Sequence, residues 1–229
     1  MQRELYRTFP GREIINYELR EFDELASAFL ALHLGAKDFN MNMQTQEIMR
    51  DIRKEFFAFR NGIVADKLRK AGDPHSMIMG CLLVDVQAIA GRVRDCITDH
   101  EQLAAIASEL WNDTHSRECR LAAPMLYPAE MMNQEQAIQW CQTVETTEIA
   151  DNLCHKLLRH TSDADSLFRH LIAQEEPLVR YTGYRLLNNL LVLHKVQASP
   201  SLRAIVEAEA RNAQPPLASL LRDVLEELD

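Results

Sequence analysis

Apolar residues recur along this chain at the spacing of a helix. Positions three and four apart are repeatedly apolar, whereas strict alternation of apolar and polar residues is missing. Such spacing lines one face of an α-helix with apolar side chains. An apolar connector at 77–81 interrupts this pattern, which otherwise predicts an all-α chain with helices over residues 13–35, 45–60, 62–71, 84–94, 99–111, 114–127, 133–143, 147–160, 163–174, 177–196, 200–212 and 216–228.

The later helices form hairpins of similar length. The clearest two cover residues 134–160 and 163–196, each with an amphipathic helix, a short polar turn and a more apolar second helix. Candidate N-cap residues recur at intervals of roughly 30 to 36 residues, the scale of helical-repeat solenoids: Asp99, Asn133, Asp163 and Ser199. We expect one α-helical repeat domain over residues 1–229, with an N-terminal helical segment (1–44) and hairpins (45–229). A non-repeating helical bundle is the alternative.

Composition supports a soluble helical protein. Hydrophobic residues make up 47% of the chain and charged residues 26%, while only 7 glycines occur. No apolar run approaches the roughly 20 residues of a membrane span, and the first residues lack the apolar region of a signal peptide. The predicted location is therefore cytoplasmic, without a membrane partner. Five cysteines stand singly within helical patterns, which indicates reduced, buried thiols.

Charge is distributed unevenly. The net charge of -9 argues against indiscriminate polyanion binding. Residues 18–24 and the last two helices are acidic, whereas one stretch is rich in basic residues: Arg50, Arg53, Lys54, Arg60, Lys67, Arg69 and Lys70. This asymmetry is typical of a nucleic-acid-binding protein whose opposite surface is acidic, although a solvated helix face explains the basic stretch equally well.

Familiar cofactor motifs are missing. The sequence has no GxxxxGK[ST] or GxGxxG loop, no HExxH and no GxSxG. The eight histidines do not cluster at ligand spacing, and His155 and His160 are expected on different faces of one helix. We therefore predict no nucleotide cofactor, no metal site and no other cofactor.

Two charged residues stand among apolar neighbours in the second helices of the two clearest hairpins. They are Asp151 in EIADNLC and Arg180 in EPLVRYTGY. A buried or half-buried charge costs several kcal/mol unless it is paired, so both residues are functional candidates. Structural alternatives are a carboxylate near a helix N-terminus and an Asp151–Arg180 ion pair that joins two repeats.

Three segments carry a family resemblance: ASELWNDTHSRECRLAAPMLY (107–127), TEIADNLCHKLL (147–158) and EPLVRYTGYRLLNNLL (176–191). Together they resemble the AlkD-type DNA alkylation repair family over roughly residues 48–196. The resemblance implies HEAT-like helical repeats, and hence a solenoid of antiparallel helix pairs. It also implies excision of cationic N3- or N7-alkylated purines from duplex DNA. The family's essential aspartate falls on Asp151, and the arginine that faces the DNA backbone falls on Arg180.

The sequence also departs from the family pattern. Thr147 stands where the family has an aromatic residue one turn before the aspartate, and no tryptophan follows Trp140. Another register, based on WCQTVE, would place the acid at Glu145, but that position falls in the turn between two helices. Aromatic residues that could replace the missing tryptophans are Tyr181, Tyr184 and Phe56, of which the two tyrosines also fit a packed core.

The leading hypothesis is a DNA glycosylase in which Asp151 stabilises the transition state. The expected DNA contacts are Arg180, Arg53, Arg60, Arg117 and Tyr181. A carboxylate would stabilise positive charge on the sugar, and arginine would hold a phosphate. The alternatives are a non-catalytic relative that binds nucleic-acid structure and a protein-interaction scaffold.

Overall fold

The computed structural model describes residues 36–229, with side chains from residue 44 onward, and this part of the chain is all-helical. The prediction of an all-α fold is confirmed here, while the helix expected at 13–35 lies outside the described residues. The α-helices are α2 (Ala36–Ala58), α3 (Gly62–Lys70), α4 (Leu83–Cys96), α5 (His100–Asn112), α6 (Arg117–Leu126), α7 (Gln134–Gln142), α8 (Thr147–Lys156), α9 (Ala164–Ile172), α10 (Pro177–Val192), α11 (Pro200–Ala210) and α12 (Leu217–Glu227). Two 3-10 turns, η1 (Ala129–Met131) and η2 (Leu158–His160), join some of them.

Side-chain caps explain where several helices begin. Asp99, Asn133 and Ser199 accept hydrogen bonds from backbone N–H groups in the first turns of α5, α7 and α11, as predicted. Ser116 caps α6 in the same way, through a hydrogen bond from the backbone nitrogen of Cys119. Asp163 precedes α9 without a side-chain capping bond, so the expected cap at this position is wrong.

Helix α8 is shorter than the sequence pattern predicts. It ends at Lys156, and Leu157 has a non-helical backbone conformation (φ -124°, ψ -66°). The chain then makes the 3-10 turn η2 instead of continuing as an α-helix to residue 160. This break changes the directions of the side chains that follow it.

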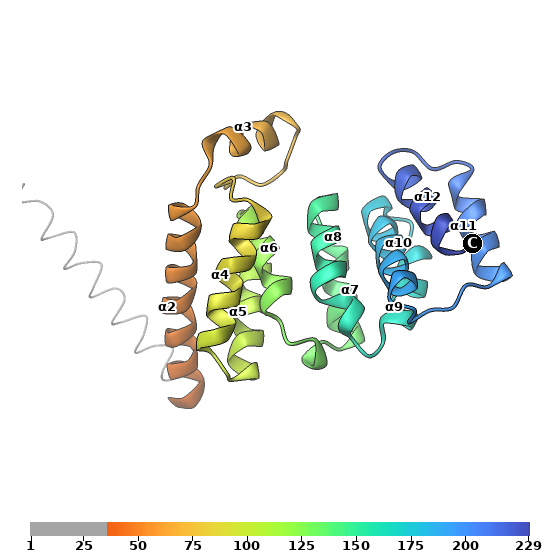
Figure 1. Ribbon diagram of the computed structural model, residues 1–229. Coiled ribbons are helices and arrows are strands. Elements are labelled where there is room, and N and C mark those ends of the chain that lie inside the picture. The colour runs from red at the N-terminus through yellow and green to blue at the C-terminus, as the bar shows by residue number, and fades with distance from the viewer. Residues whose placement is uncertain (1–35) are drawn as a thin grey trace, which may run out of the picture. The chain divides into compact units, whose positions relative to one another are not determined.

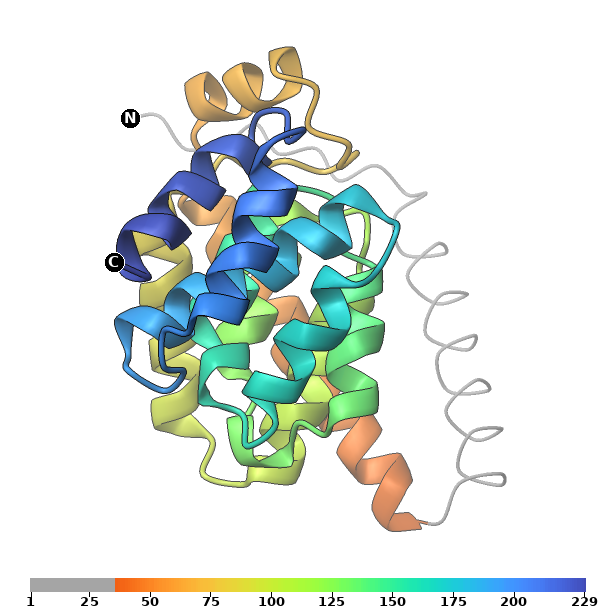
Figure 2. The same cartoon turned by 90° about the vertical axis from the view of Figure 1, so that its right-hand side faces the viewer.

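The chain divides into two compact units, residues 1–47 and 48–229. Within the second unit, α4 packs on α6, α6 on α8, α8 on α10 and α10 on α12. The intervening helices pack against this row, α5 on α6, α9 on α10 and α11 on α12 (Figures 1 and 2). One hydrophobic core runs through this unit from Met49 to Leu228. Helices α4, α6, α8, α10 and α12 therefore form one layer of this unit.

Gly183 allows α9 and α10 to approach closely. A Cβ atom at this position would lie 2.8 Å from the Ile172 nitrogen and 2.8 Å from Cβ of Leu171. Gly80 is required for its backbone conformation as well as for space, since its φ is +76° and a Cβ atom would clash with the Asn61 carbonyl oxygen. At both positions a larger residue would clash with neighbouring atoms.

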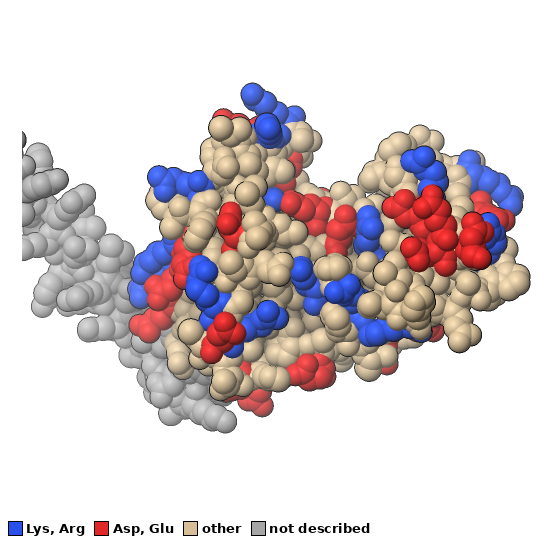
Figure 3. All heavy atoms as spheres, in the orientation of Figure 1, with Lys and Arg blue, Asp and Glu red and all other residues tan. Residues whose placement is uncertain are grey.

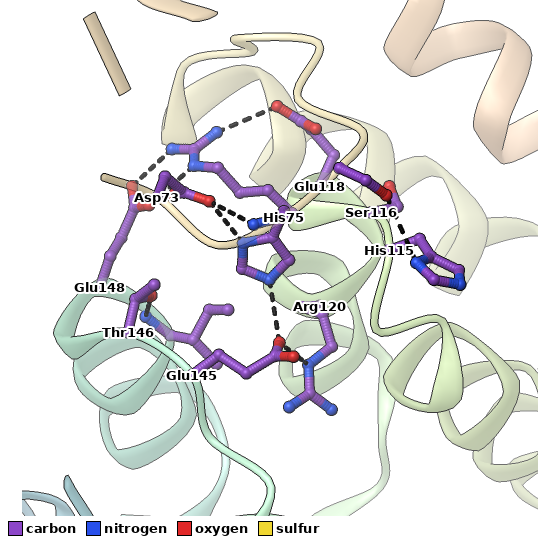
Figure 4. Close-up of polar contacts among 12 residues, drawn as sticks. Asp73, His75, His115, Ser116, Glu118, Arg120, Glu145, Thr146 and Glu148 are labelled. Carbon is purple, nitrogen blue, oxygen red and sulfur yellow. Dashed lines mark hydrogen bonds and ion pairs between the residues drawn. The ribbon is translucent and has the colours of Figure 1, made fainter. Parts of the chain in front are cut away.

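The segment between α3 and α4 is fastened to α6 by a buried carboxylate. Glu118 is fully buried and accepts hydrogen bonds from the backbone nitrogens of Met79, Gly80 and Cys81 at 2.9–3.2 Å. Arg117 lies 3.0 Å from Glu118 and also binds Glu148 of α8 (Figure 4). This network links three elements that are distant in sequence.

Four of the five cysteines are free, buried thiols, as predicted, but Cys96 is exposed at the end of α4. Burial raises the pKa of Cys81 to about 12 and that of Cys119 to about 11, so both stay protonated at neutral pH. Among the described residues, no helix is long and apolar enough to cross a membrane.

Candidate functional site

Asp151 lies in the middle of α8, and its side chain is 43% exposed. Its Oδ1 atom accepts a hydrogen bond from the Tyr181 hydroxyl at 3.0 Å and another from Nε of Arg185 at 2.7 Å. Nη2 of Arg185 also donates to the Tyr181 hydroxyl at 3.2 Å. No described residue donates a hydrogen bond to Oδ2. The carboxylate is therefore held through one oxygen, and the other is free to meet an incoming group.

Both donors to Asp151 keep their protons at neutral pH. Burial raises the pKa of Tyr181, and the negative charge of Asp151 acts in the same direction. Burial lowers the pKa of Arg185, but the hydrogen bond with Tyr181 and the charge of Asp151 outweigh it, so the pKa is raised overall. The site consequently contains an ionised guanidinium and a neutral phenol on one side of the carboxylate.

A cleft opens beside this network. Its volume is about 400 Å³, and its lining comes from α8, α10 and the start of α4: Leu83, Glu148, Asp151, Asn152, His155, Lys156, Arg185 and Asn189. A smaller hollow of about 220 Å³ shares two of these residues and is lined by Gln87, Arg94, Met125, His155, Lys156, Arg159 and His160. The shared residues make the two hollows neighbours on one face.

Basic side chains line the smaller hollow or lie next to it. Arg94, Lys156, Arg159 and Lys195, here called the basic row, form no ion pair with a carboxylate among the described residues; instead, Lys156 Nζ donates to Gln87 and Lys195 Nζ donates to the carbonyl oxygen of Arg159. Lys and Arg atoms gather on the same face, over the lower part of α8 and its neighbours (Figure 3). This surface is therefore suited to an anion, despite the acidic net charge of the chain.

Two histidines lie against Arg159 of the basic row. Arg159 contacts Nδ1 of His155 at 3.1 Å and donates from Nε to Nε2 of His160 at 3.1 Å. Burial lowers the pKa of both histidines, and the charge of Arg159 lowers it further. A regular helix would place these rings on different faces, but the 3-10 turn η2 brings both to Arg159.

The arginines expected to contact DNA lie elsewhere or are already paired. Arg53 binds Asp113 at 2.9 Å, and Arg60 lies over the Phe57 ring at 4.1 Å. Arg117 is only 3% exposed, and its guanidinium is occupied by carboxylates and a backbone carbonyl oxygen. Arg117 was expected to contact a DNA phosphate. In the structure its side chain is buried and instead joins α6 to α8.

Arg180 is separate from the Asp151 network. It lies 3.2 Å from Glu209 of α11, in a cavity of about 530 Å³ between the start of α10 and the turn before α12. The predicted alternative of an Asp151–Arg180 ion pair is wrong, since Arg185 takes that place at 2.7 Å. Tyr181 is 5% exposed and connects the two regions, because its side chain lines this cavity while its hydroxyl binds Asp151.

Glu145, the acid of the alternative register, belongs to a different cluster. It lies in the turn between α7 and α8, 3.1 Å from Nε2 of His75 and 3.5 Å from Nε of Arg120. His75 is buried, and its Nδ1 lies 2.6 Å from Asp73 (Figure 4). This cluster ties the α3–α4 segment to the α7–α8 turn, which favours Asp151 over Glu145 as the acid available to a ligand.

The two tryptophans are core residues. Trp111 and Trp140 stack with ring centroids 4.4 Å apart, and the Arg120 guanidinium lies 3.8 Å from the Trp111 centroid. Both are at most 5% exposed. Neither indole therefore contributes to the cleft beside Asp151.

Comparison with known proteins agrees with the sequence resemblance. The model of a family described as DNA alkylation repair enzyme matches residues 52–208. This match contains Asp151, the donors to its carboxylate and the basic row. Neither curated proteins nor solved structures gave a match. Because the family model covers more than half of the chain, the protein belongs to the DNA alkylation repair enzyme family.

Proposed function

We propose that this protein is a DNA glycosylase that releases cationic N3- or N7-alkylated purines from duplex DNA. The observation that carries the proposal is the Asp151 carboxylate, which is anchored through Oδ1 at a cleft beside the basic row; among the described residues, Oδ2 accepts no hydrogen bond and the basic row has no carboxylate partner. Family membership supplies the class of reaction. The basic row supplies a reason for DNA to bind next to Asp151.

The chemistry requires little beyond a well-placed negative charge. Alkylation at N3 or N7 makes the purine cationic, and hence a good leaving group. As the N-glycosidic bond breaks, the sugar gains oxocarbenium character, which a carboxylate stabilises. Asp151 would supply that charge and orient the water that attacks C1′. The water's oxygen bonds to C1′, the bonding electrons leave with the purine, and a proton is lost to solvent.

DNA would be held through its phosphates. Lys156 lines the cleft together with Asp151, and Arg159 lines the neighbouring hollow, so both cations lie beside the acid. Lys195 and Arg94 extend the row from the α10 end and from α4. Such contacts provide affinity and orientation that do not depend on the DNA base sequence. A repair enzyme needs this independence, because lesions occur in any sequence context.

We further propose that the helix pairs are HEAT-like repeats. Support comes from the continuous layer α4, α6, α8, α10 and α12, with a second row of helices packed against it. In such an arrangement one helix of each pair lies along the same face. Asp151, Arg185 and Lys156 all come from this layer, so the proposed DNA site would use the repeated face.

A single-turnover assay on duplex DNA containing N7-methylguanine tests the enzymatic proposal. The wild-type protein should release the base, and Asp151→Asn should lower the rate at least 100-fold, the order expected for loss of one electrostatic stabiliser. Asp165→Asn is the matched control, because this exposed aspartate of α9 pairs with Arg169 and does not line the cleft. No release by wild type, or equal release by Asp151→Asn, rejects the proposal.

A non-catalytic DNA-structure binder is the second candidate. The observation that favours it is the lining of the cleft, which includes no Phe, Trp or Tyr side chain to contact a damaged base. This candidate predicts binding that weakens steeply with salt, without base release. Binding and release measured on the same duplex therefore separate the two candidates.

A further inference from the structure

The direction of the Asp151 carboxylate is set by α10 and not by its own helix. A terminal carboxylate on an exposed helix face has a broad torsional preference about χ2. Here Oδ1 receives two donors, the Tyr181 hydroxyl at 3.0 Å and Arg185 Nε at 2.7 Å. Two donors at one oxygen restrict both the rotation of the carboxylate and the exchange of its oxygens.

The donors are themselves held in place. Tyr181 is 5% exposed, and the next residue, Thr182, is fully buried and bonded to the Leu178 carbonyl oxygen. Arg185 donates from Nη2 to the Tyr181 hydroxyl, so each donor constrains the other. The helix that carries them is in close contact with α9 at Gly183. Rigid support of this kind is what an accurately placed reactive group needs.

We propose that Tyr181 and Arg185 are positioning residues that hold Asp151 with one oxygen presented to the sugar. This inference rests on the proposed glycosylase function and deepens it. Neither residue is assigned to the reacting atoms themselves. Arg185 supplies the charged donor, and Tyr181 supplies a neutral donor that fixes direction without cancelling more of the negative charge that the sugar requires.

The test compares two substitutions that remove the same atom from the same helix. Tyr181→Phe deletes the hydroxyl that binds Asp151, and Tyr184→Phe deletes the hydroxyl of a buried tyrosine that makes no hydrogen bond to Asp151. Tyr181→Phe should lower the single-turnover release of N7-methylguanine about tenfold, as expected for one lost hydrogen bond. Tyr184→Phe should leave the rate within about twofold.

Three further measurements distinguish positioning from a structural role. DNA affinity of Tyr181→Phe should equal that of wild type, so the loss falls on the rate and not on binding. Arg185→Lys, which keeps the charge but loses the planar donor, should also slow release. Adding Tyr181→Phe to Asp151→Asn should cause no further loss, because a residue that acts through Asp151 has nothing left to position.

The outcomes separate this proposal from the one on which it rests. If wild type releases base and Tyr181→Phe releases it at the same rate, the positioning role is wrong and the glycosylase proposal stands. Equal, additive losses in the wild-type and Asp151→Asn backgrounds also overturn it. If wild type releases no base, both proposals fall.

Discussion

Lys156 and Arg159 should supply about half of the electrostatic affinity for DNA. We consider the double substitution Lys156→Met and Arg159→Met, which removes two of the four basic-row charges while keeping chain length and helix propensity. Each cation that neutralises one phosphate contributes about -0.9 to the slope of log K against log salt concentration. The slope should therefore change from about -3.6 in wild type to about -1.8 in the variant.

The slopes translate into affinities that anisotropy of a labelled duplex can measure. Between about 50 and 200 mM salt, wild-type affinity should fall about 150-fold and that of the variant only about 12-fold. Measurements at four or more salt concentrations define each slope. The duplex needs no lesion, because phosphate contacts do not depend on the base.

A matched control removes two charges elsewhere. Arg169 and Arg203 are paired with nearby carboxylates, and neither borders the cleft. Arg169→Met with Arg203→Met should leave the slope near -3.6, the value expected for four phosphate contacts. Equal slopes for wild type and the Lys156→Met, Arg159→Met variant, or an equal change in the control, would refute the assignment of the basic row as the DNA contact.

Three predictions concern stability, each measured by urea denaturation. Glu118→Ala should lower the free energy of unfolding by about 3–5 kcal/mol, because it leaves three backbone N–H groups without an acceptor and removes a partner of Arg117; a loss under about 1 kcal/mol would contradict the fastening role. Gly183→Ala should lower the free energy of unfolding by about 1–3 kcal/mol, because the added methyl group overpacks the contact with α9. Gly91 has open space around it, so Gly91→Ala should raise the free energy of unfolding by up to about 1 kcal/mol. A change of the same sign in both variants would contradict the packing argument. The folded-state pKa of His155 is lowered, so the unfolded chain binds more protons than the folded one, and the free energy of unfolding should fall as pH decreases below about 6.5. Arg159→Met should reduce that fall, because it removes a positive charge that lowers the pKa of His155. An unchanged pH profile would contradict the coupling between Arg159 and His155.

Helix positions were predictable because their signals are local. Asp99, Asn133 and Ser199 stand directly before periodic apolar segments, and each caps the helix that follows. Asp163 carries the same signal but makes no capping bond, since its backbone conformation (φ -99°, ψ 19°) is not the extended one of the other caps. Residue type alone does not determine that conformation.

The candidate site was predictable only in part. Asp151 was identifiable as a charge among apolar residues of α8, and this local feature needs no knowledge of the fold. Its partner Arg185 was missed, because an arginine in YRLLNN is typical of a solvated helix face. The pairing depends on how α8 and α10 pack, since Asp151 and Arg185 are distant in sequence.

The basic row was missed for a related reason. Lys156 and Arg159 belong to α8 and its following turn, whereas Lys195 lies beyond the end of α10, so no single stretch of sequence looks basic. The stretch that does look basic, residues 50–70, contains side chains that pair with neighbouring carboxylates, such as Arg69 with Asp66. The sequence pattern predicts one continuous helix to residue 160, so it gives no sign that the turn η2 brings Arg159 to both His155 and His160.

The stacked indoles of Trp111 and Trp140 determine what intrinsic fluorescence can report. They are the only tryptophans of the chain, and they lie parallel, buried and in contact. Their emission should respond as one signal to melting of the α5–α7 region. This emission follows unfolding of the protein and should stay constant when a duplex binds at the cleft beside Asp151, whose lining contains neither tryptophan.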